Sequence, residues 1–172
     1  KARLLDRHGE PSGTPKMGRA VAALCRIAFD LARQVDVAGI AETALAGIFE
    51  GTSVDAGAIL LAPREMDEKP VGADLDVVAS QAREDSRYHR ITGFLASTVL
   101  GDGEAVLARN IGDDSALASR DSKGEIESTS VICAPIRHDN EVLGIIHLYS
   151  TNSERTLDPD DLEFTLAVAD NL

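Results

Sequence analysis

The stretch SVICAPIRHDNEVLGIIHLY, residues 130–149, decides the fold class. Two apolar runs, residues 131–137 and 142–149, flank four polar residues, and Asn140 among these suits a turn. This pattern predicts a β-hairpin. Side chains alternate between the two faces of a strand, and both faces of the first run are largely apolar. We therefore expect the hairpin to form the middle of a sheet that is covered on both sides.

Two helices are expected before this hairpin. Apolar residues at spacings of three and four predict a helix over residues 15–35 and a second helix from its N-cap Asp36 to Gly51. The apolar face of the first helix is expected to consist of Val21, Leu24, Ala28, Leu31 and Val35.

Further elements complete the pattern. Short apolar runs predict strands over residues 58–62, 75–80 and 105–108 and a helix over residues 91–100. Asp158 as N-cap and Pro159 in the first helical position begin a last helix, whose pattern runs to the end of the chain. The order is two helices, two strands, a helix, three strands and a helix. This order predicts an α+β fold with an antiparallel sheet.

Composition limits the class of protein. The chain has 172 residues, which suits one domain, and a formal net charge of −12. Such an acidic segment repels nucleic acid and anionic membrane surfaces, so we expect neither as a partner. No apolar run approaches the roughly 18 residues of a membrane-spanning helix. Cys25 and Cys133 lie in apolar segments without a CxxC spacing, which predicts two buried thiols in a reducing, cytoplasmic protein.

The two ends of the chain indicate a larger parent protein. Residues 1–13 carry mixed charge, Pro11 and two glycines, and are expected to be a linker from an upstream region. The folded domain would then span residues 14–172. Because the chain begins with Lys1 and its last helical pattern has no Gly or Pro stop, we expect a fragment.

The sequence resembles the GAF family of sensory domains in SVICAPI at residues 130–136, LGIIHL at 143–148, LDPDDLEF at 157–164, and GEAVL at 103–107 followed by Asp113. The resemblance covers roughly residues 17–172. It implies a GAF-like (profilin-like) α+β fold with a central antiparallel sheet of five or six strands. The N- and C-terminal helices would pack on one face, and a helix and loops would form a pocket on the other.

The resemblance also implies a function. GAF domains of bacterial regulators often follow a forkhead-associated domain and precede a sigma-54 activator, a cyclase or a kinase. We therefore expect a non-catalytic module that binds a small ligand or a partner. Its terminal helices would pair in a homodimer and relay the signal to an effector domain in the same chain. Two alternatives are a structural dimerisation domain without ligand and a small redox enzyme such as a methionine-sulfoxide reductase relative, which needs reactive, exposed cysteines.

Six residues are candidates for ligand binding. His147 interrupts an apolar strand, and a pocket-lining donor or a buried structural histidine would both fit there. Polar residues follow the strand at 105–108, where the resemblance implies the border of a pocket; a solvated loop is the alternative, and the simpler explanation. The candidates are Arg109, Asn110, Asp113, Ser130, Ile132 and His147.

Several ligand classes are not expected. GAF domains that bind cyclic nucleotides share an Asn-Lys…Phe…Asp-Glu signature. Asn152 and Asp161 match two of its positions, but Ser153, Leu157 and Leu162 replace the Lys, Phe and Glu. Neither cysteine has the setting of a bilin attachment site, so no covalent chromophore is expected. The histidines share no metal-binding pattern, and the sequence contains no G-x-S-x-G or Walker motif, so we expect neither a metal nor catalytic residues.

Overall fold

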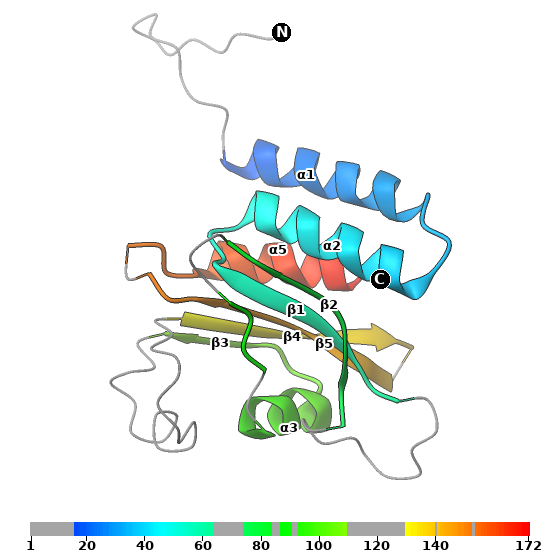
Figure 1. Cartoon of the computed structure of the whole chain (residues 1–172). Helices are drawn as coiled ribbons and strands as arrows, with labels where there is room; N and C mark the ends of the chain where they lie inside the picture. The colour runs from blue at the N-terminus through cyan, green and yellow to red at the C-terminus, as the bar shows by residue number, and fades with distance from the viewer. Residues whose placement is uncertain are drawn as a thin grey trace, which may run out of the picture.

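The computed structural model describes residues 16–63, 74–83, 87–90, 93–109, 130–139, 141–152 and 154–172. A five-stranded antiparallel sheet, ordered β2-β1-β5-β4-β3, has α1, α2 and α5 on one face and α3 on the other (Figure 1). This arrangement confirms the predicted α+β fold. The elements are α1 (Lys16–Leu31), α2 (Val37–Gly51), β1 (Ala56–Leu61), β2 (Asp76–Ala82), α3 (Gly93–Asp102), β3 (Val106–Arg109), β4 (Ser130–His138), β5 (Glu141–Ser150) and α5 (Pro159–Ala169).

The predicted hairpin is β4 and β5, and it lies inside the sheet as expected. Its connection is tighter than predicted, because β4 ends at His138 and β5 begins at Glu141. Two residues therefore connect the strands, and Asp139 takes the left-handed conformation with φ 53°. Asp tolerates this conformation better than most residues do. On β5, a side chain at Gly144 would collide with the carbonyl oxygen of Leu60, so glycine permits the close approach of β1.

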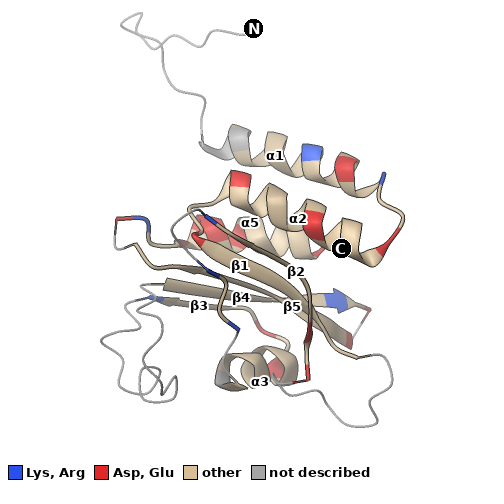
Figure 2. Cartoon of the chain, in the orientation of Figure 1, with Lys and Arg blue, Asp and Glu red and all other residues tan. Residues whose placement is uncertain are grey.

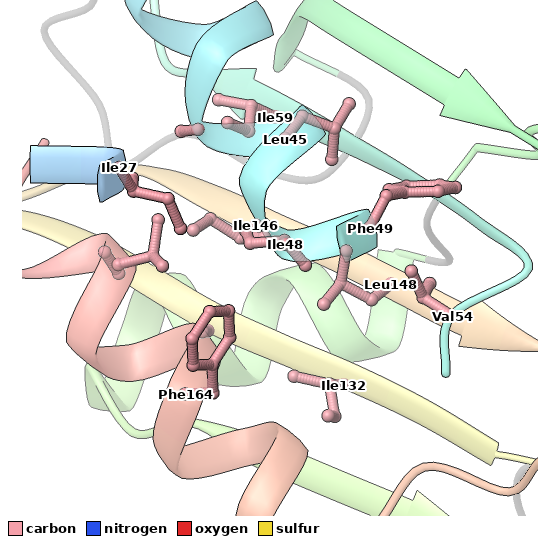
Figure 3. Packing of buried hydrophobic residues seen from close by; sticks show 14 of the residues in the cluster. Ile27, Leu45, Ile48, Phe49, Val54, Ile59, Ile132, Ile146, Leu148 and Phe164 are labelled. Atoms are coloured by element: carbon pink, nitrogen blue, oxygen red, sulfur yellow. The ribbon is translucent and has the colours of Figure 1, made fainter. Parts of the chain in front are cut away.

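The larger part of the core lies between the sheet and the helices α1, α2 and α5. Figure 3 shows Ile132 from β4 and Ile146 from β5 together with Ile48 from α2 and Phe164 from α5. All four side chains are buried. Burying one such side chain completely contributes about 1.5–3 kcal/mol to stability. This layer therefore fixes the positions of α2 and α5 on the sheet.

Helix α1 differs from the sequence-based expectation. Its buried face contains Ala23, Ile27 and Leu31, whereas Val21 is 52% exposed and Val35, which lies beyond the helix, is 96% exposed. The predicted face was right for Leu31 and Leu24 but wrong for Val21, Ala28 and Val35, because α1 is apolar on two sides. Its spacing alone does not tell which side packs on the other helices. For the same reason Cys25 is exposed and not buried as expected.

The helix starts confirm the predicted caps. The Asp36 carboxylate accepts a hydrogen bond from the amide of Gly39 at 2.7 Å. At the start of α5, Asp158 and Asp161 each accept from the other's backbone amide at 3.0 Å. This reciprocal capping box satisfies two amides that the helix leaves unpaired. Helix α5 ends at Ala169, earlier than its apolar pattern suggests.

Two further expectations concern the chain as a whole. The proposed linker, residues 1–13, lies outside the described residues. Within the described part of the chain, no helix has the length and apolar character that are needed to cross a bilayer.

Candidate functional site

Two polar aromatic side chains are buried on the α3 face of the sheet, and a third, partly buried, packs on them. His147 on β5 is only 5% exposed, and its neighbours on the adjacent strands are Ala58 and Cys133. These neighbours are small, so they leave room above the imidazole ring. Tyr149 lies two residues further along β5 on the same face and is 2% exposed.

Tyr88 fills the space above these two residues. Its hydroxyl oxygen lies 3.2 Å from Nδ1 of His147. Its ring centroid is 5.7 Å from that of His147, edge to face, and 6.3 Å from that of Tyr149, in a stacked arrangement. These separations are typical of favourable aromatic pairs. We call Tyr88, His147 and Tyr149 the aromatic cluster.

The residues around Tyr88 are held in place by side chains. Residues 87–90 have no regular secondary structure. The Tyr149 hydroxyl accepts a hydrogen bond from the amide of His89 at 2.9 Å and donates one to the carbonyl of Arg87. The guanidinium of Arg90 donates to the carbonyl of Leu75. This segment is therefore attached to the sheet without belonging to it.

The three groups His147, Cys133 and Tyr149 are uncharged at neutral pH. Burial lowers the pKa of His147 to about 3. Burial also raises the pKa of the Cys133 thiol, so that residue is not a thiolate. The pKa of Tyr149 is raised, first by burial and also by the negative charge of Asp55. The cluster thus offers neutral hydrogen-bonding groups and aromatic faces, and it contains no activated nucleophile.

A second polar group lies where β5 ends. The Asp55 side chain, 2% exposed, accepts hydrogen bonds through Oδ2 from Ser150 Oγ at 2.9 Å, the Thr151 amide at 3.0 Å and the Asn152 amide at 3.3 Å. Its Oδ1 lies 3.5 Å from the Arg155 guanidinium. We call Asp55 with these four partners the Asp55 hub. It fixes the connection that leads from β5 to α5.

Two more hydrogen bonds extend this connection. The Ser130 hydroxyl accepts from the amide of Leu157 at 2.8 Å, just before α5 begins. The Asp55 amide donates to the carbonyl of Tyr149 at 3.0 Å. The aromatic cluster, the hub and the start of α5 are therefore joined within a short stretch of chain.

The fold agrees with that of known proteins. The profile of the GAF domain family matches residues 36–172. The chain belongs to the GAF family. No curated protein sequence matched it.

Solved structures of two GAF domains and of one enzyme have the same fold at low sequence identity. The GAF domain from Acinetobacter phosphoenolpyruvate-protein phosphotransferase has a TM-score of 0.69 and 15% identity, covering 92% of this chain and 91% of that chain. The A. aeolicus nlh2 GAF domain in an inactive state has a TM-score of 0.64 and 17% identity, with coverages of 91% and 94%. Free methionine-R-sulfoxide reductase from Neisseria meningitidis, in complex with its substrate, has a TM-score of 0.66 and 17% identity, with coverages of 99% and 93%. At these identities the likeness concerns the fold.

The GAF fold separates the residues that the sequence singled out. Ser130 and Ile132 lie on the helix face, opposite to His147, because they alternate with Val131 and Cys133 along β4. The structure therefore does not bring these two residues together with His147. The reason is that both faces of β4 are apolar, so the strand pattern does not say which face lies toward the pocket.

The other candidates lie at the edge of the sheet or beyond the described part. Arg109 is paired with Ser130 in the register of β3 and β4, so it also belongs to the helix face, and it is exposed. Asn110 and Asp113 lie outside the described residues. Among the described residues, no group of three His, Cys, Asp or Glu side chains is placed to hold a metal ion.

Sequence reasoning missed Tyr88, Tyr149 and Asp55. Tyr88 belongs to a charged stretch without periodicity, so its position over the sheet was not predictable. Tyr149 was assigned to the correct strand, and its alternation with His147 was a usable signal. Asp55 precedes a strand and resembles an ordinary solvated turn residue; its partners lie 95 to 97 residues away in the sequence.

A cavity of about 540 Å³ opens elsewhere, between α1 and α2. Its lining includes Ile27 and Gly47 and the charged residues Arg26 and Glu50, whose side chains are 3.6 Å apart and each 69% exposed. This groove therefore lies on the outer side of the helix layer, away from the buried aromatic cluster.

Proposed function

We propose that this GAF domain is a non-catalytic regulatory module. It binds a small ligand on the α3 face of its sheet and passes the signal through α1 and α5 to an effector domain, such as a transcription activator, kinase or cyclase. One observation carries the proposal: Tyr149 of the aromatic cluster and Ser150 of the Asp55 hub are consecutive residues of β5. The proposed ligand site would thus lie next to the strand end that leads to the output helix α5.

The coupling follows from this arrangement. A ligand that changes the position of Tyr149 also changes the strand end that Asp55 holds, and with it the approach to α5. A ligand shifts such an equilibrium only through its different affinities for the two arrangements. Contacts with the aromatic cluster that differ between the two arrangements would supply this difference.

The state of the two thiols supports a role without catalysis. Sulfoxide reduction on this fold needs reactive, exposed cysteines. Cys133 is buried with a raised pKa, and Cys25 is exposed on α1, at a distance in the fold from the α3 face. Thiol titration of the native domain tests this point. We expect Cys25 to react and Cys133 to stay unreactive until the domain unfolds, whereas two reactive thiols would favour the redox alternative.

We also propose a homodimer in which the terminal helices pair. The outward side of α1 is apolar, and Figure 2 shows few charged positions along the described part of this helix. Phe29 is 68% exposed there. Exposed residues recur at spacings of three and four, which is the spacing of a helix-pairing seam. This outer stripe of α1 consists of Gly18, Val21, Ala22, Cys25, Ala28 and Phe29.

The central test is whether the domain carries a ligand that alters α5. Native mass spectrometry of protein from its own host would detect a bound small molecule. Hydrogen exchange with and without that molecule would then report on residues 157–169. We expect slower or faster exchange in α5 when the ligand is bound. A ligand-free protein that stays ligand-free in a metabolite screen would favour the structural dimerisation domain instead.

A further inference from the structure

The Tyr88 ring occupies the position that a ligand on this face would need. It packs against the buried residues of the α3 face, and its ring contacts those of His147 and Tyr149. The cross-strand neighbours of His147, Ala58 and Cys133, are too small to fill this space. The ring comes from residues 87–90, which are attached through side chains and form no part of the sheet.

We infer that Tyr88 is an internal substitute for the ligand, and that the ligand is an uncharged, hydroxylated, planar aromatic compound that displaces the Tyr88 ring from His147 and Tyr149. This inference rests on the proposed function, since it assigns the ligand class of the same site.

The shape of the ligand follows from the ring geometry. One ring must present its edge or face to His147 at a centroid distance near 5.7 Å and stack on Tyr149 near 6.3 Å. A planar aromatic ring fulfils both requirements, and an aliphatic compound would lose the directional part of both contacts.

The hydroxyl group follows from the imidazole. Nδ1 of His147 is buried and is paired with the Tyr88 hydroxyl at 3.2 Å. A ligand that removed this hydroxyl without replacing it would leave a buried polar atom unsatisfied, which is unfavourable. A hydroxyl can donate or accept a hydrogen bond, so it fits either tautomer of the ring.

The absence of charge follows from the neighbours. Two of the rings that contact Tyr88 belong to His147 and Tyr149, and neither provides a full opposite charge. A carboxylate or ammonium on the ligand ring would lose its water without gaining an ion pair from these two rings.

Displacement of Tyr88 would leave the sheet intact. Residues 87–90 are held by the Tyr149 hydroxyl and by the bond from Arg90 to Leu75, and these bonds are separate from the strand pairing. Releasing the ring would change the partners of Tyr149, whose carbonyl is bonded to the Asp55 amide. The ligand would thereby act on the strand end that leads to α5.

The test uses 4-methylphenol, which is the tyrosine side chain as a free compound, and toluene as the matched probe without a hydroxyl. The first protein is Tyr88→Ala, in which the site is vacated. We expect 4-methylphenol to bind this variant at least tenfold more tightly than it binds the wild type. It should also bind this variant more tightly than toluene binds the same variant. If Tyr88→Ala does not fold alone, 4-methylphenol should restore folding and toluene should not. The inference is overturned if the two probes act equally or if neither binds or rescues.

A second variant tests the role of the imidazole. In Tyr88→Ala with His147→Leu, the preference for 4-methylphenol over toluene should disappear. A preference that survives would overturn the assigned contact. The chain has two tyrosines and no tryptophan, so tyrosine signals report on this cluster alone. With ring-labelled tyrosine in the wild type, NMR should show the Tyr88 resonance moving to the position of an exposed tyrosine at saturating 4-methylphenol.

Failure of this inference is distinguishable from failure of the proposed function. If 4-methylphenol binds Tyr88→Ala but hydrogen exchange in α5 does not change, the ligand class stands and the relay to α5 fails. If neither probe binds while another metabolite changes the exchange of α5, the relay stands and the assignment of the ligand class fails.

Discussion

The amide of Asp55 donates a hydrogen bond to the carbonyl of Tyr149 at 3.0 Å, while the Asp55 carboxylate accepts from the residue that follows, Ser150, at 2.9 Å. One buried residue thus holds both the last residue of the aromatic cluster and the last residue of β5, after which the connection to α5 begins. Both hydrogen bonds therefore act on the same strand end.

Removal of the Asp55 carboxylate should loosen the approach to α5. In Asp55→Ala, the Ser150 hydroxyl and the amides of Thr151 and Asn152 lose the buried carboxylate that they share as an acceptor. We expect the free energy of unfolding to fall by about 3 kcal/mol, measured by urea denaturation, because several hydrogen bonds to one buried carboxylate are lost together. The control is Arg155→Ala, whose side chain is 49% exposed and should cost less than about 1 kcal/mol. Equal losses in the two variants would contradict the role of the hub.

The buried His147 should make the domain sensitive to mild acid. The pKa of His147 falls from 6.5 in the unfolded chain to about 3 in the folded protein. Below pH 6.5 the unfolded chain therefore binds a proton at this histidine, whereas the folded protein does not. The stabilising contribution is present above pH 6.5 and is lost as the pH falls. Between pH 7 and pH 5 we expect a loss of about 2 kcal/mol in unfolding free energy.

The matched variant for this prediction is His147→Asn, which keeps a polar atom near Nδ1 but does not titrate. Its unfolding free energy should change less than that of the wild type over the same range of pH. If both proteins show the same dependence on pH, then other groups cause it and the prediction about His147 is wrong.

Glycine at position 144 should be essential for sheet packing. In Gly144→Ala, the new methyl group would meet the backbone oxygen of Leu60, which is fixed in β1 and cannot move aside. We expect a loss of at least about 2 kcal/mol, since strain in a packed core is costly. In the control Gly101→Ala, the methyl group meets nothing within 4 Å, and the exposed helical site should gain up to about 1 kcal/mol. Thermal unfolding of both variants gives the comparison.

The outer stripe of α1 should control self-association. In Phe29→Glu, a charge replaces the largest exposed side chain of this stripe, and sedimentation equilibrium should show a dimer dissociation constant at least about tenfold higher, or about 1.4 kcal/mol weaker association. The control is Val35→Glu, because Val35 is 96% exposed and lies beyond the helix. A wild-type protein that is monomeric at all concentrations would remove the proposed dimer.

The sequence predicted the fold well because its elements have clear periodicity. Both strands of the hairpin alternate between two apolar faces, and the caps at Asp36 and Asp158 have the expected chemistry. The face of α1 was not predictable, since Val21 and Ile27 are equally apolar and only tertiary packing decides which is buried. Sequence patterns report on local structure, and the choice of face depends on distant elements.

The candidate site was predictable only in part. His147 was found because it interrupts an apolar strand, where a polar side chain indicates either a site or a specific hydrogen bond. Its partner Tyr88 lies 59 residues earlier and has no local signal that would connect the two. Asp55 was missed for the same reason. Hydrogen bonds over such separations depend on the assembled sheet, so they become visible only in the structure.

Helix α1 rests on α2 and α5, and it precedes the residues that match the family profile. The short turn between α1 and α2 is therefore a convenient splice junction for chimeric proteins. A foreign helix fused at this junction would need to match the surface of two helices and would leave the sheet unaltered. Insertion of three or four residues at the junction would rotate the fused helix by a known angle. Such a series of chimeras offers a direct way to connect this domain to a new input.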